Sequence, residues 1–247
     1  MSKTDVLEAA QQIVRAANEA GLKLRLLGGV AIRLRSPSAA THPRLKRTYP
    51  DIDVVGLKAE SRRLTQLFVE QGYQPDRRFN ALHGYKRMIF HDSERHVDVF
   101  LDAFEMCHRI PLRDRLLPGY LALPLADLLM TKLQIVELNA KDLQDILVLL
   151  LDHEIDTTEH PDRIDASYLS RLTAADWGLF TTLSDNLARV AETASEFLSV
   201  EETERVTTRT HAIVEAMQQA AKTLKWRARA SIGRRIEWYE LPDEVAR

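Results

Sequence analysis

The sequence predicts an α+β protein, with a small mixed sheet and its helices in the N-terminal part and helices alone in the C-terminal part. Two observations predict this class. Short apolar runs with strand character recur between residues 24 and 101, and these strand signals stop after residue 120. Beyond that point apolar residues recur three and four positions apart, which is the spacing of helices. Strands early and helices late are typical of an α+β arrangement.

The N-terminal part alternates helix and strand signals. Apolar residues at helical spacing predict a helix over 4–20, which Gly21 ends, and Leu24–Leu27 is a strand. The pair Gly28-Gly29 predicts a tight turn, after which a helix begins at Val30. Further along, the pattern predicts a loop over 36–50, a strand over 52–57, a helix over 61–71, and strands over 86–90 and 96–101.

The C-terminal part shows helical spacing almost throughout. The predicted helices cover 125–138, 141–151, 168–173, 176–199 and 201–224, with a short final piece. A polar stretch over 152–165, with several acids and Pro161, separates the first two of these helices from the rest. We therefore predict two domains, 1–155 and 160–247.

Composition limits the classes of protein and of partner. The chain has 247 residues, 45 % of them hydrophobic and 28 % charged, which is typical of a globular protein. The formal net charge is −2, so the overall charge does not favour binding to nucleic acid or to a membrane. The single cysteine, Cys107, excludes an internal disulfide and a cysteine zinc cluster. With no signal-peptide core and no long apolar run, we expect a cytoplasmic protein without a membrane partner.

The run Asp51-Ile52-Asp53 is the most informative chemical feature. Side chains alternate along a strand, so Asp51 and Asp53 point to the same face. Acids are disfavoured in strands, although a solvated strand face could carry them. Asp98 repeats the pattern between two valines, with Asp102 as an alternative on the same face. Since Mg²⁺ (or Mn²⁺) prefers carboxylate oxygens and leaves room for substrate phosphates, we predict phosphoryl or nucleotidyl chemistry.

Three further features have two interpretations each. Gly28-Gly29 is a tight turn, or a place where the backbone approaches a phosphate. Lys132 lies on the apolar stripe of its helix, where it extends along that surface or presents a positive charge to the site. Asp142 follows the candidate N-cap Asn139, so its charge stabilises the start of the helix, or it has a role in binding.

Two stretches carry basic residues and no acid. Between Glu19 and Asp51 the basic residues are Lys23, Arg25, Arg33, Arg35, Arg44, Lys46 and Arg47. A triphosphate bound nearby would find positive surroundings. Between Ala216 and Ile236 they are Lys222, Lys225, Arg227, Arg229, Arg234 and Arg235, with Trp226 among them. This second stretch is a solvated face or a surface for RNA or phosphate.

The order of these motifs resembles that of the nucleotidyltransferase superfamily of the DNA polymerase beta type. The resemblance is carried by Leu26-Leu27-Gly28-Gly29-Val30-Ala31 and by Arg47-Thr48-Tyr49-Pro50-Asp51-Ile52-Asp53. Within the superfamily the chain looks most similar to AbiEii-like and MenT-like toxin nucleotidyltransferases, on account of Lys132, Lys141-Asp142 and Asp145. It departs at Val30, where Ser or Thr is common, and in the long spacer between Gly29 and Asp51.

The resemblance implies a role for each matching residue. Asp51, Asp53 and Asp98 would bind the metal, with Asp98 at a second metal position or acting as general base. Gly28, Gly29, Arg47, Thr48, Lys132 and Asp142 would bind the nucleotide, and Lys132 would also stabilise phosphate charge. The family reaction is attack of an acceptor hydroxyl on the α-phosphorus of an NTP, with release of pyrophosphate.

Several functions stay open from the sequence. The first is a toxin of a toxin–antitoxin pair that transfers NMP to tRNA or to a protein, with a small antitoxin as partner. The second is a nucleotidyltransferase acting on a small molecule such as an antibiotic. The third is a nucleotide-binding or partner-binding module without turnover.

Overall fold

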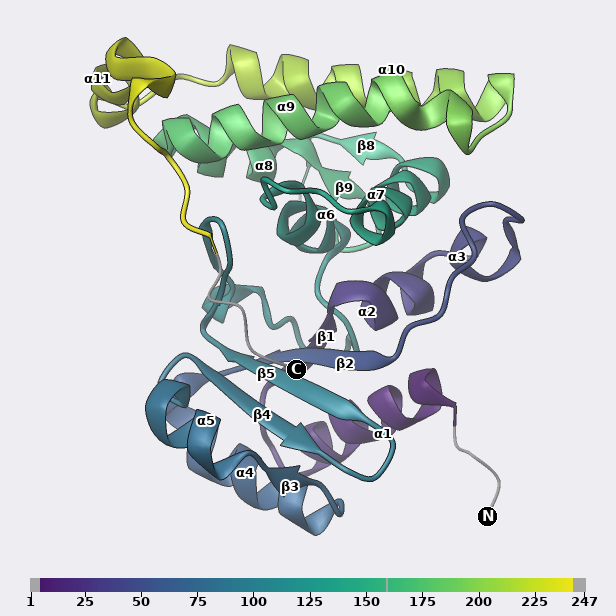
Figure 1. Cartoon of the computed structure of the whole chain (residues 1–247), viewed down its shortest axis with the longest axis vertical. Helices are drawn as coiled ribbons and strands as arrows, with labels where there is room; N and C mark the ends of the chain where they lie inside the picture. Colours follow the sequence, from purple (N-terminus) through teal and green to yellow (C-terminus); the bar gives the residue numbers. More distant parts are fainter. Residues whose placement is uncertain (1–4, 159, 242–247) are drawn as a thin grey trace. The chain divides into compact units, whose positions relative to one another are not determined.

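The computed structural model describes residues 5–158 and 160–241 and divides the chain into two compact units (Figure 1). The sheet unit comprises Met1–Pro37, Arg47–Phe104 and Ile110–Leu123. The helical unit comprises Ser38–Lys46, Glu105–Arg109 and Pro124–Arg247. Residue 4, where the first predicted helix starts, and the two ends of the predicted domains, 1–4 and 242–247, lie outside the described residues.

The sheet unit contains a five-stranded sheet in the order β1-β2-β5-β4-β3. The central pair, β2 and β5, is parallel, and the other three pairs are antiparallel, so the sheet is mixed as predicted. Its strands are β1 (Leu24–Leu27), β2 (Asp51–Gly56), β3 (Gln74–Pro75), β4 (Arg87–His91) and β5 (His96–Leu101). Its helices are α1 (Val6–Glu19), α2 (Gly28–Arg35), α4 (Ser61–Glu70) and α5 (Arg77–His83), with short 3₁₀ turns at Lys58–Glu60 and Arg113–Arg115.

The two faces of β2 have different surroundings. Ile52 and Val54 are fully buried on one face, which α4 covers: an added Cβ at Gly56 would lie 2.8 Å from a methyl of Leu64. Figure 1 shows α1 and α4 on this side of the sheet and α2 on the other. Asp51 and Asp53, which alternate with Ile52 and Val54 along the strand and point to the opposite face, are only half-buried. One face of β2 is therefore apolar and buried, and the other carries the two acids beside the buried Val55.

The helical unit follows the spacing of apolar residues in its sequence. Its α-helices are α3 (Ser38–Thr41), α6 (Leu125–Leu133), α7 (Ala140–Asp152), α8 (Ala166–Ala175), α9 (Trp177–Thr193), α10 (Val200–Gln219) and α11 (Leu224–Ile232). Two short 3₁₀ turns cover Ala194–Glu196 and Gly233–Arg235, and β8 (Ile155–Asp156) pairs with β9 (Ile164–Asp165). The strands β6 (Ala103–Glu105) and β7 (Arg109–Pro111) form a separate hairpin, whose residues are divided between the two units.

The α+β class, with a mixed sheet followed by helices, is confirmed. Local predictions were wrong in several places: the helices predicted over 176–199 and 201–224 end at Thr193 and Gln219, and α5 and the β6–β7 hairpin were not predicted. Gly28 and Gly29 are the first residues of α2 rather than a turn before it, and the loop over 36–50 contains α3. The helix predicted over 125–138 ends at Leu133, because the buried side chain of Asn186 donates to the carbonyls of Leu133 and Ile135.

The compact units divide the chain differently from the predicted domains. The helices α6 and α7 group with the later helices, whereas the predicted boundary lies after them, between 155 and 160. The domain limits 1–155 and 160–247 stay a prediction. Among the described residues, no helix has both the length and the apolar character needed to cross a membrane.

Candidate active site

The acids of β2 lie beside Asp98 of β5. In the parallel pairing of these strands, Asp53 is opposite Asp98 and Asp51 is opposite His96. Residues opposite each other in a parallel pair point to the same face, so the three acids and His96 share one face of the sheet. This arrangement brings together the three carboxylates that the sequence singled out.

Asp98 is held by two basic side chains. Its Oδ1 accepts from Nε and Nη2 of Arg87, each at 2.8 Å, and its Oδ2 lies 3.2 Å from Nε2 of His96. The hydrogen bond to Asp98 raises the pKa of His96 above its ordinary value, against the opposing effect of burial, and the charges of Asp98 and Asp51 add to the rise. Asp98 is therefore oriented by the protein itself.

Gly28 brings the start of α2 against Asp53. An added Cβ at Gly28 would lie 2.1 Å from Oδ2 of Asp53, which leaves no space for any side chain. The backbone of Gly28 also has a φ of +66°, a conformation that other residues rarely adopt. Glycine is thus required twice at this position, by its conformation and by its contact with the acid.

Gly29 lies against Arg47 and Tyr49. An added Cβ there would be 2.5 Å from Nη2 of Arg47 and 2.7 Å from the ring of Tyr49. The guanidinium of Arg47 stacks on that ring at 3.9 Å and donates to the carbonyl of Thr48. Thr48 itself is exposed, and its carbonyl is the group that contacts Arg47. Arg47, at the end of the long spacer between Gly29 and Asp51, therefore lies beside the glycine pair.

The first turn of α2 offers backbone donors. The N-cap residue is Leu27, whose side chain makes no capping hydrogen bond. The first N–H groups of a helix have no partner within the helix, and its dipole favours a negative charge there. A helix start with two glycines, an arginine and a carboxylate beside it is suited to a phosphate with its metal ion.

Lys132 forms an ion cluster within the helical unit. Its Nζ lies 2.8 Å from Oδ1 of Asp142 and 2.9 Å from Oδ2 of Asp145, and the three side chains are 13 %, 9 % and 1 % exposed. Burial lowers the pKa of Lys132, but the charges of Asp145 and Asp142 outweigh it, so the pKa lies above its ordinary value. The side chain points inward, as the apolar stripe predicted, toward two acids of α7.

Two other polar side chains, those of Asn139 and Asp102, accept hydrogen bonds from backbone N–H groups. Asn139 caps α7 by accepting from the N–H groups of Lys141 and Asp142, as the sequence predicted for a helix start. Asp102 adopts a φ of 63° just beyond β5 and accepts from the N–H of Lys58. Asp102, the alternative to Asp98, thus has a structural explanation in the turn.

The described residues contain no group of three or more His, Cys, Asp or Glu side chains arranged to hold a metal ion. A smaller set fits Mg²⁺ or Mn²⁺. Such ions are commonly bound by one or two carboxylates together with substrate phosphates. Asp51 and Asp53 supply two half-buried carboxylates on one face, whereas Asp98 already pairs with Arg87 and His96.

The first basic stretch is partly structural. Arg25 is buried and donates to the carbonyls of Leu117 and Leu24 and to the side chain of Asn18, so its charge is used inside the sheet unit. Burial lowers its pKa. Arg44 belongs to the helical unit. Arg47, another of the seven basic residues, lies against Gly29.

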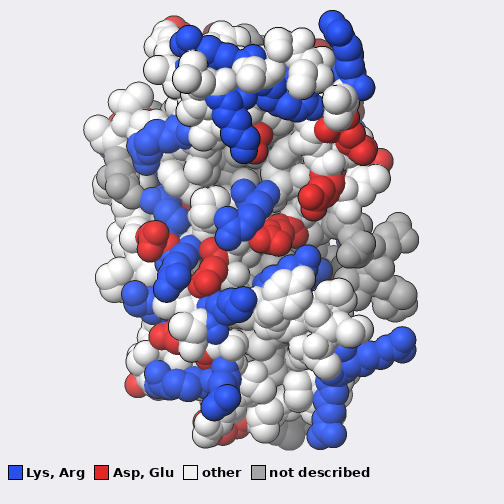
Figure 2. All heavy atoms as spheres, turned by 90° about the vertical axis from the view of Figure 1, so that its left-hand side faces the viewer, with Lys and Arg blue, Asp and Glu red and all other residues white. Residues whose placement is uncertain are grey.

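The second basic stretch covers α11 and the turn after it. Figure 2 shows Lys and Arg side chains spread over the upper part of the face where α11 lies. Arg229 donates to the carbonyls of Gly233 and Ile236, and Arg234 pairs with Asp185 at 2.7 Å. Trp226 packs edge-on against Phe180. Among the described residues, the exposed basic side chains of this stretch that have no described partner are Lys225, Arg227 and Arg235.

Three residues of the site were missed in the sequence. Arg87 and His96 hold Asp98, and Tyr49 supports Arg47. His96 could have been found, because it precedes Asp98 by two positions and so shares its face. Arg87 could not, because the antiparallel pairing of β4 with β5 brings it there.

No protein-family model matches the chain, and no curated protein matches it significantly. Among solved structures it is similar to the solution structure of the antibiotic-resistance factor ANT(2'')-Ia, at 14 % identity and a TM-score of 0.41, over 68 % of this chain and 93 % of that chain. The crystal structure of ANT(2'')-Ia in complex with adenylyl-2''-tobramycin gives 14 % identity and a TM-score of 0.39, over 58 % and 86 %.

The crystal structure of the Megavirus polyadenylate synthase gives 13 % identity and a TM-score of 0.35, over 70 % of this chain and 37 % of that chain. These similarities are low in sequence and in backbone agreement. The function is therefore inferred from the residues of the site.

Proposed function

We propose that the protein is a metal-dependent nucleotidyltransferase that moves NMP from an NTP to an acceptor hydroxyl. The observation that carries the proposal is the contact of Asp53 with Gly28 at the start of α2, with Asp51 and Asp98 on the same face. A carboxylate beside the first N–H groups of a helix repels a phosphate unless a cation lies between them. The pairing of these groups thus supports a site for a phosphate together with its metal ion.

Asp51 and Asp53 are the proposed ligands of Mg²⁺ or Mn²⁺. When bound, the ion would neutralise phosphate charge and favour departure of pyrophosphate. Gly28 and Gly29 would donate backbone N–H groups to the triphosphate, and Arg47 would add a positive charge beside them. Thr48 is proposed to contribute through its backbone.

In the proposed reaction the acceptor oxygen forms a bond to the α-phosphorus. The bond from that phosphorus to the bridging oxygen breaks, and pyrophosphate leaves with the electron pair. Asp98 would take the proton of the acceptor hydroxyl or complete a second metal position. Arg87 and His96 orient Asp98 for either role by their contacts with its two oxygens.

Lys132 and Asp142 stay predicted nucleotide-binding residues. Their ion cluster with Asp145 accounts for the burial of all three side chains without a ligand. A catalytic role for Lys132 would require the ammonium to exchange at least one of these acids for a phosphate.

The test replaces each proposed metal ligand while keeping its shape. Asp51→Asn and Asp53→Asn should each lower Mg²⁺-dependent pyrophosphate release by at least about a hundredfold, the scale for losing one electrostatic stabiliser. Each NTP is assayed with cell extract as the source of acceptor. Asp114→Asn is the control, since this exposed acid of the sheet unit has no described partner. Full activity in both site variants would overturn the assignment.

A steric test addresses the contact between Gly28 and Asp53. Gly28→Ala adds a methyl group where Asp53 lies, so Mg²⁺-NTP should no longer raise the melting temperature, as a bound ligand otherwise does. Gly21→Ala is the matched control, because Gly21 also has a positive φ of +69° but has nothing within 4 Å of an added Cβ. If both variants respond to Mg²⁺-NTP as the wild type does, the contact has no part in binding.

For the acceptor we propose RNA, tRNA in particular, ahead of a protein. Lys225, Arg227 and Arg235 are exposed cations on a stretch without acids, which suits a phosphate backbone. Their joint replacement by Gln should weaken RNA binding and reduce its salt dependence, while NTP binding is unchanged. Arg229 and Arg234 stay in place because they hold the local fold. Label on a protein or on a small molecule instead would favour those acceptors.

The role of toxin in a toxin–antitoxin pair rests on the AbiEii-like and MenT-like resemblance alone. Growth arrest on induction of the wild type, but not of Asp53→Asn, would support it. A small protein encoded beside it that relieves the arrest would be the expected antitoxin. Turnover without growth arrest would favour the small-molecule enzyme, and NTP binding without turnover would favour the binding module.

A further inference from the structure

A cleft of about 390 Å³ lies between α4, α5 and the start of β4 in the sheet unit. Met88, which lines it, alternates with Arg87 along β4 and so points to the face of the sheet opposite to the acids. The other lining residues come mainly from the two helices, among them Ser61, Arg62, Thr65, Arg77 and Gly84. The candidate active site does not use this cleft, although both belong to one unit.

The helix α5 takes part in both the cleft and the surroundings of the acids, and it lies beside β4 (Figure 1). Its Asn80 donates to the carbonyl of Ile89 at 3.0 Å and accepts from the N–H of Ile89 at 2.7 Å, as a neighbouring strand would. The ring of Phe79 lies 5.7 Å from the guanidinium of Arg87, which belongs to the candidate site. The same helix thus lines the cleft with Arg77 and contacts the candidate site with Phe79.

Four basic side chains lie at the cleft and its rim. Arg62 and Arg77 line the cleft and are exposed. The other two are Lys58, just before α4, and Lys86, just before β4. Among the described residues, none of the four pairs with an acid. The surface therefore carries positive charge that no carboxylate neutralises through a direct contact.

Three acids near this surface are each held by a backbone N–H group: Glu60, Asp76 and Asp102. Asp76 caps the start of α5, and Asp102 accepts from the N–H of Lys58. Their carboxylates thus hold turns and a helix start instead of pairing with the four cations. An anionic ligand would meet those cations directly.

Tyr85 lies at the rim of the cleft, in the turn between α5 and β4 and next to Gly84. It is 57 % exposed, and the Nζ atoms of Lys58 and Lys86 lie 5.7 Å and 6.0 Å from its ring centroid. An exposed aromatic ring beside cations suits single-stranded nucleic acid, because a base stacks on the ring while its phosphates meet the cations.

We propose that the cleft and Tyr85 bind a single-stranded segment of the RNA acceptor. This inference rests on the proposed function, to which it adds a place for the acceptor within the sheet unit. The carbonyl of Lys86 accepts from the N–H of Leu101, which follows Asp98 by three positions, about 10 Å along β5. A few stacked nucleotides, each about 3.4 Å, span that distance. RNA held at Tyr85 thus has its end within reach of Asp98.

The first experiment removes the aromatic ring. Binding of a fluorescein-labelled single-stranded RNA to the full chain is measured by fluorescence anisotropy, without NTP. Tyr85→Ala should raise the Kd about tenfold, because the stacking of one base is lost. Tyr85→Phe keeps the ring and should bind as the wild type does. Val69→Ala is the control, since Val69 is an exposed apolar residue at the far end of α4.

The second experiment removes the charges by replacing four residues together with Gln: Lys58, Arg62, Arg77 and Lys86. The RNA affinity is then measured over a series of salt concentrations. The slope of log K against log salt should fall by about 0.7 for each cation that meets a phosphate. Arg113→Gln is the control, because Arg113 is an exposed basic residue of the sheet unit without a described partner. If the fourfold variant does not fold, Arg62→Gln combined with Arg77→Gln provides the same test with two cations.

Weaker RNA binding in Tyr85→Ala, together with a smaller slope in the charge variant, supports the proposal. Wild-type affinity in Tyr85→Ala or an unchanged slope overturns it. An equal loss for duplex RNA in Tyr85→Ala also overturns it, because paired bases are not available to stack on the ring.

The proposed function fails in a different way. A wild type that transfers NMP but binds no RNA overturns this inference and leaves the proposed function standing. A wild type that binds RNA through Tyr85 but releases no pyrophosphate from any NTP refutes the proposed function, and with it the role of the RNA as acceptor. In every variant Mg²⁺-NTP should raise the melting temperature as it does in the wild type, since none of the replaced residues belongs to the proposed nucleotide site.

Discussion

Two clusters of acids and bases differ in how far they are shielded from water. In the sheet unit, Asp98 pairs with Arg87 and His96, whose side chains are 23 % and 42 % exposed. In the helical unit, Lys132 pairs with Asp142 and Asp145, and no side chain of the three exceeds 13 %. We call these the sheet cluster and the helical cluster.

The difference in exposure suggests a difference in role. Charges removed from water must neutralise each other, and breaking such a set is costly because water cannot replace the lost partner. Charges at a half-exposed face can exchange partners with water or a ligand at lower cost. The helical cluster is thus suited to stability, and the sheet cluster to binding and chemistry.

The largest effect is expected for Lys132→Met. Methionine keeps the apolar stem and leaves Asp142 and Asp145 facing each other without a cation, which should lower the free energy of unfolding by about 3–5 kcal/mol. Urea denaturation followed by circular dichroism measures this loss. Lys141→Met is the control, because Lys141 is exposed on α7, the helix that carries Asp142 and Asp145.

A compensated variant sharpens the same test. Adding Asp142→Asn and Asp145→Asn to Lys132→Met removes the uncompensated charge and should recover a large part of the stability. If Lys132→Met instead unfolds like the wild type and loses only activity, Lys132 has the phosphate-binding role that the family resemblance implies.

A smaller effect is expected for Arg87→Met in the sheet cluster. Asp98 keeps its contact with His96 and gains water, so the loss should be about 1.5–3 kcal/mol, the scale of hydrogen bonds to a charged group. The same denaturation experiment measures it, with Arg95→Met as control on a neighbouring ion pair with Asp92. A loss as large as that of Lys132→Met would remove the contrast between the clusters.

Features that depend on neighbouring residues in sequence were predictable. The alternation along β2 placed Asp51 and Asp53 on one face, and Asn139 was correctly expected to cap α7. The apolar stripe of α6 predicted that Lys132 points inward. Each of these follows from local geometry, which the order of residues determines.

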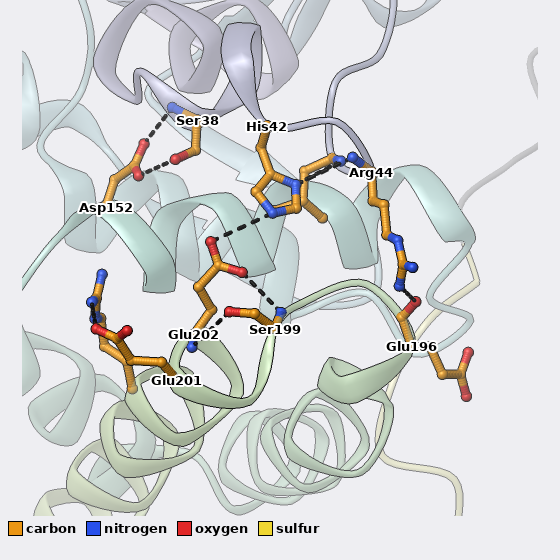
Figure 3. A network of polar contacts seen from close by, with 10 residues as sticks. Ser38, His42, Arg44, Asp152, Glu196, Ser199, Glu201 and Glu202 are labelled. Carbon is orange, nitrogen blue, oxygen red and sulfur yellow. Dashed lines mark hydrogen bonds and ion pairs between the residues drawn. The ribbon is translucent and has the colours of Figure 1, made fainter.

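Features that depend on distant residues were not predictable. The acids that pair with Lys132, Asp142 and Asp145, lie in the next helix. The sequence analysis named both, but their neighbours in the sequence do not indicate which cation they would pair with. Arg87 reaches Asp98 only through strand pairing, and Ser38, in the segment predicted as a loop, is held by Asp152, more than a hundred positions away (Figure 3). Gly28 was expected at a turn, but its contact with Asp53 became visible only in the structure.

The smallest effect is a dependence of stability on pH that comes from His96. Its hydrogen bond with Asp98 raises its pKa in the folded protein above the ordinary value, so folding favours the protonated ring. The resulting stabilisation is complete below the unfolded pKa of about 6.5 and is lost as the pH rises through the folded pKa.

His96→Gln should therefore lower the free energy of unfolding more at about pH 6 than at about pH 9. The difference should stay below about 1 kcal/mol, because the ring is 42 % exposed and water screens the pair. Urea titrations at both pH values measure it, with His91→Gln as control, an exposed histidine on β4. An equal loss at both pH values would mean that the ring contributes packing rather than charge. The same titrations with Mg²⁺ and NTP provide a final test. If both bind at Asp51 and Asp53, they should change how the free energy of unfolding of the wild type depends on pH. They should not change the difference in free energy of unfolding between Lys132→Met and Lys141→Met.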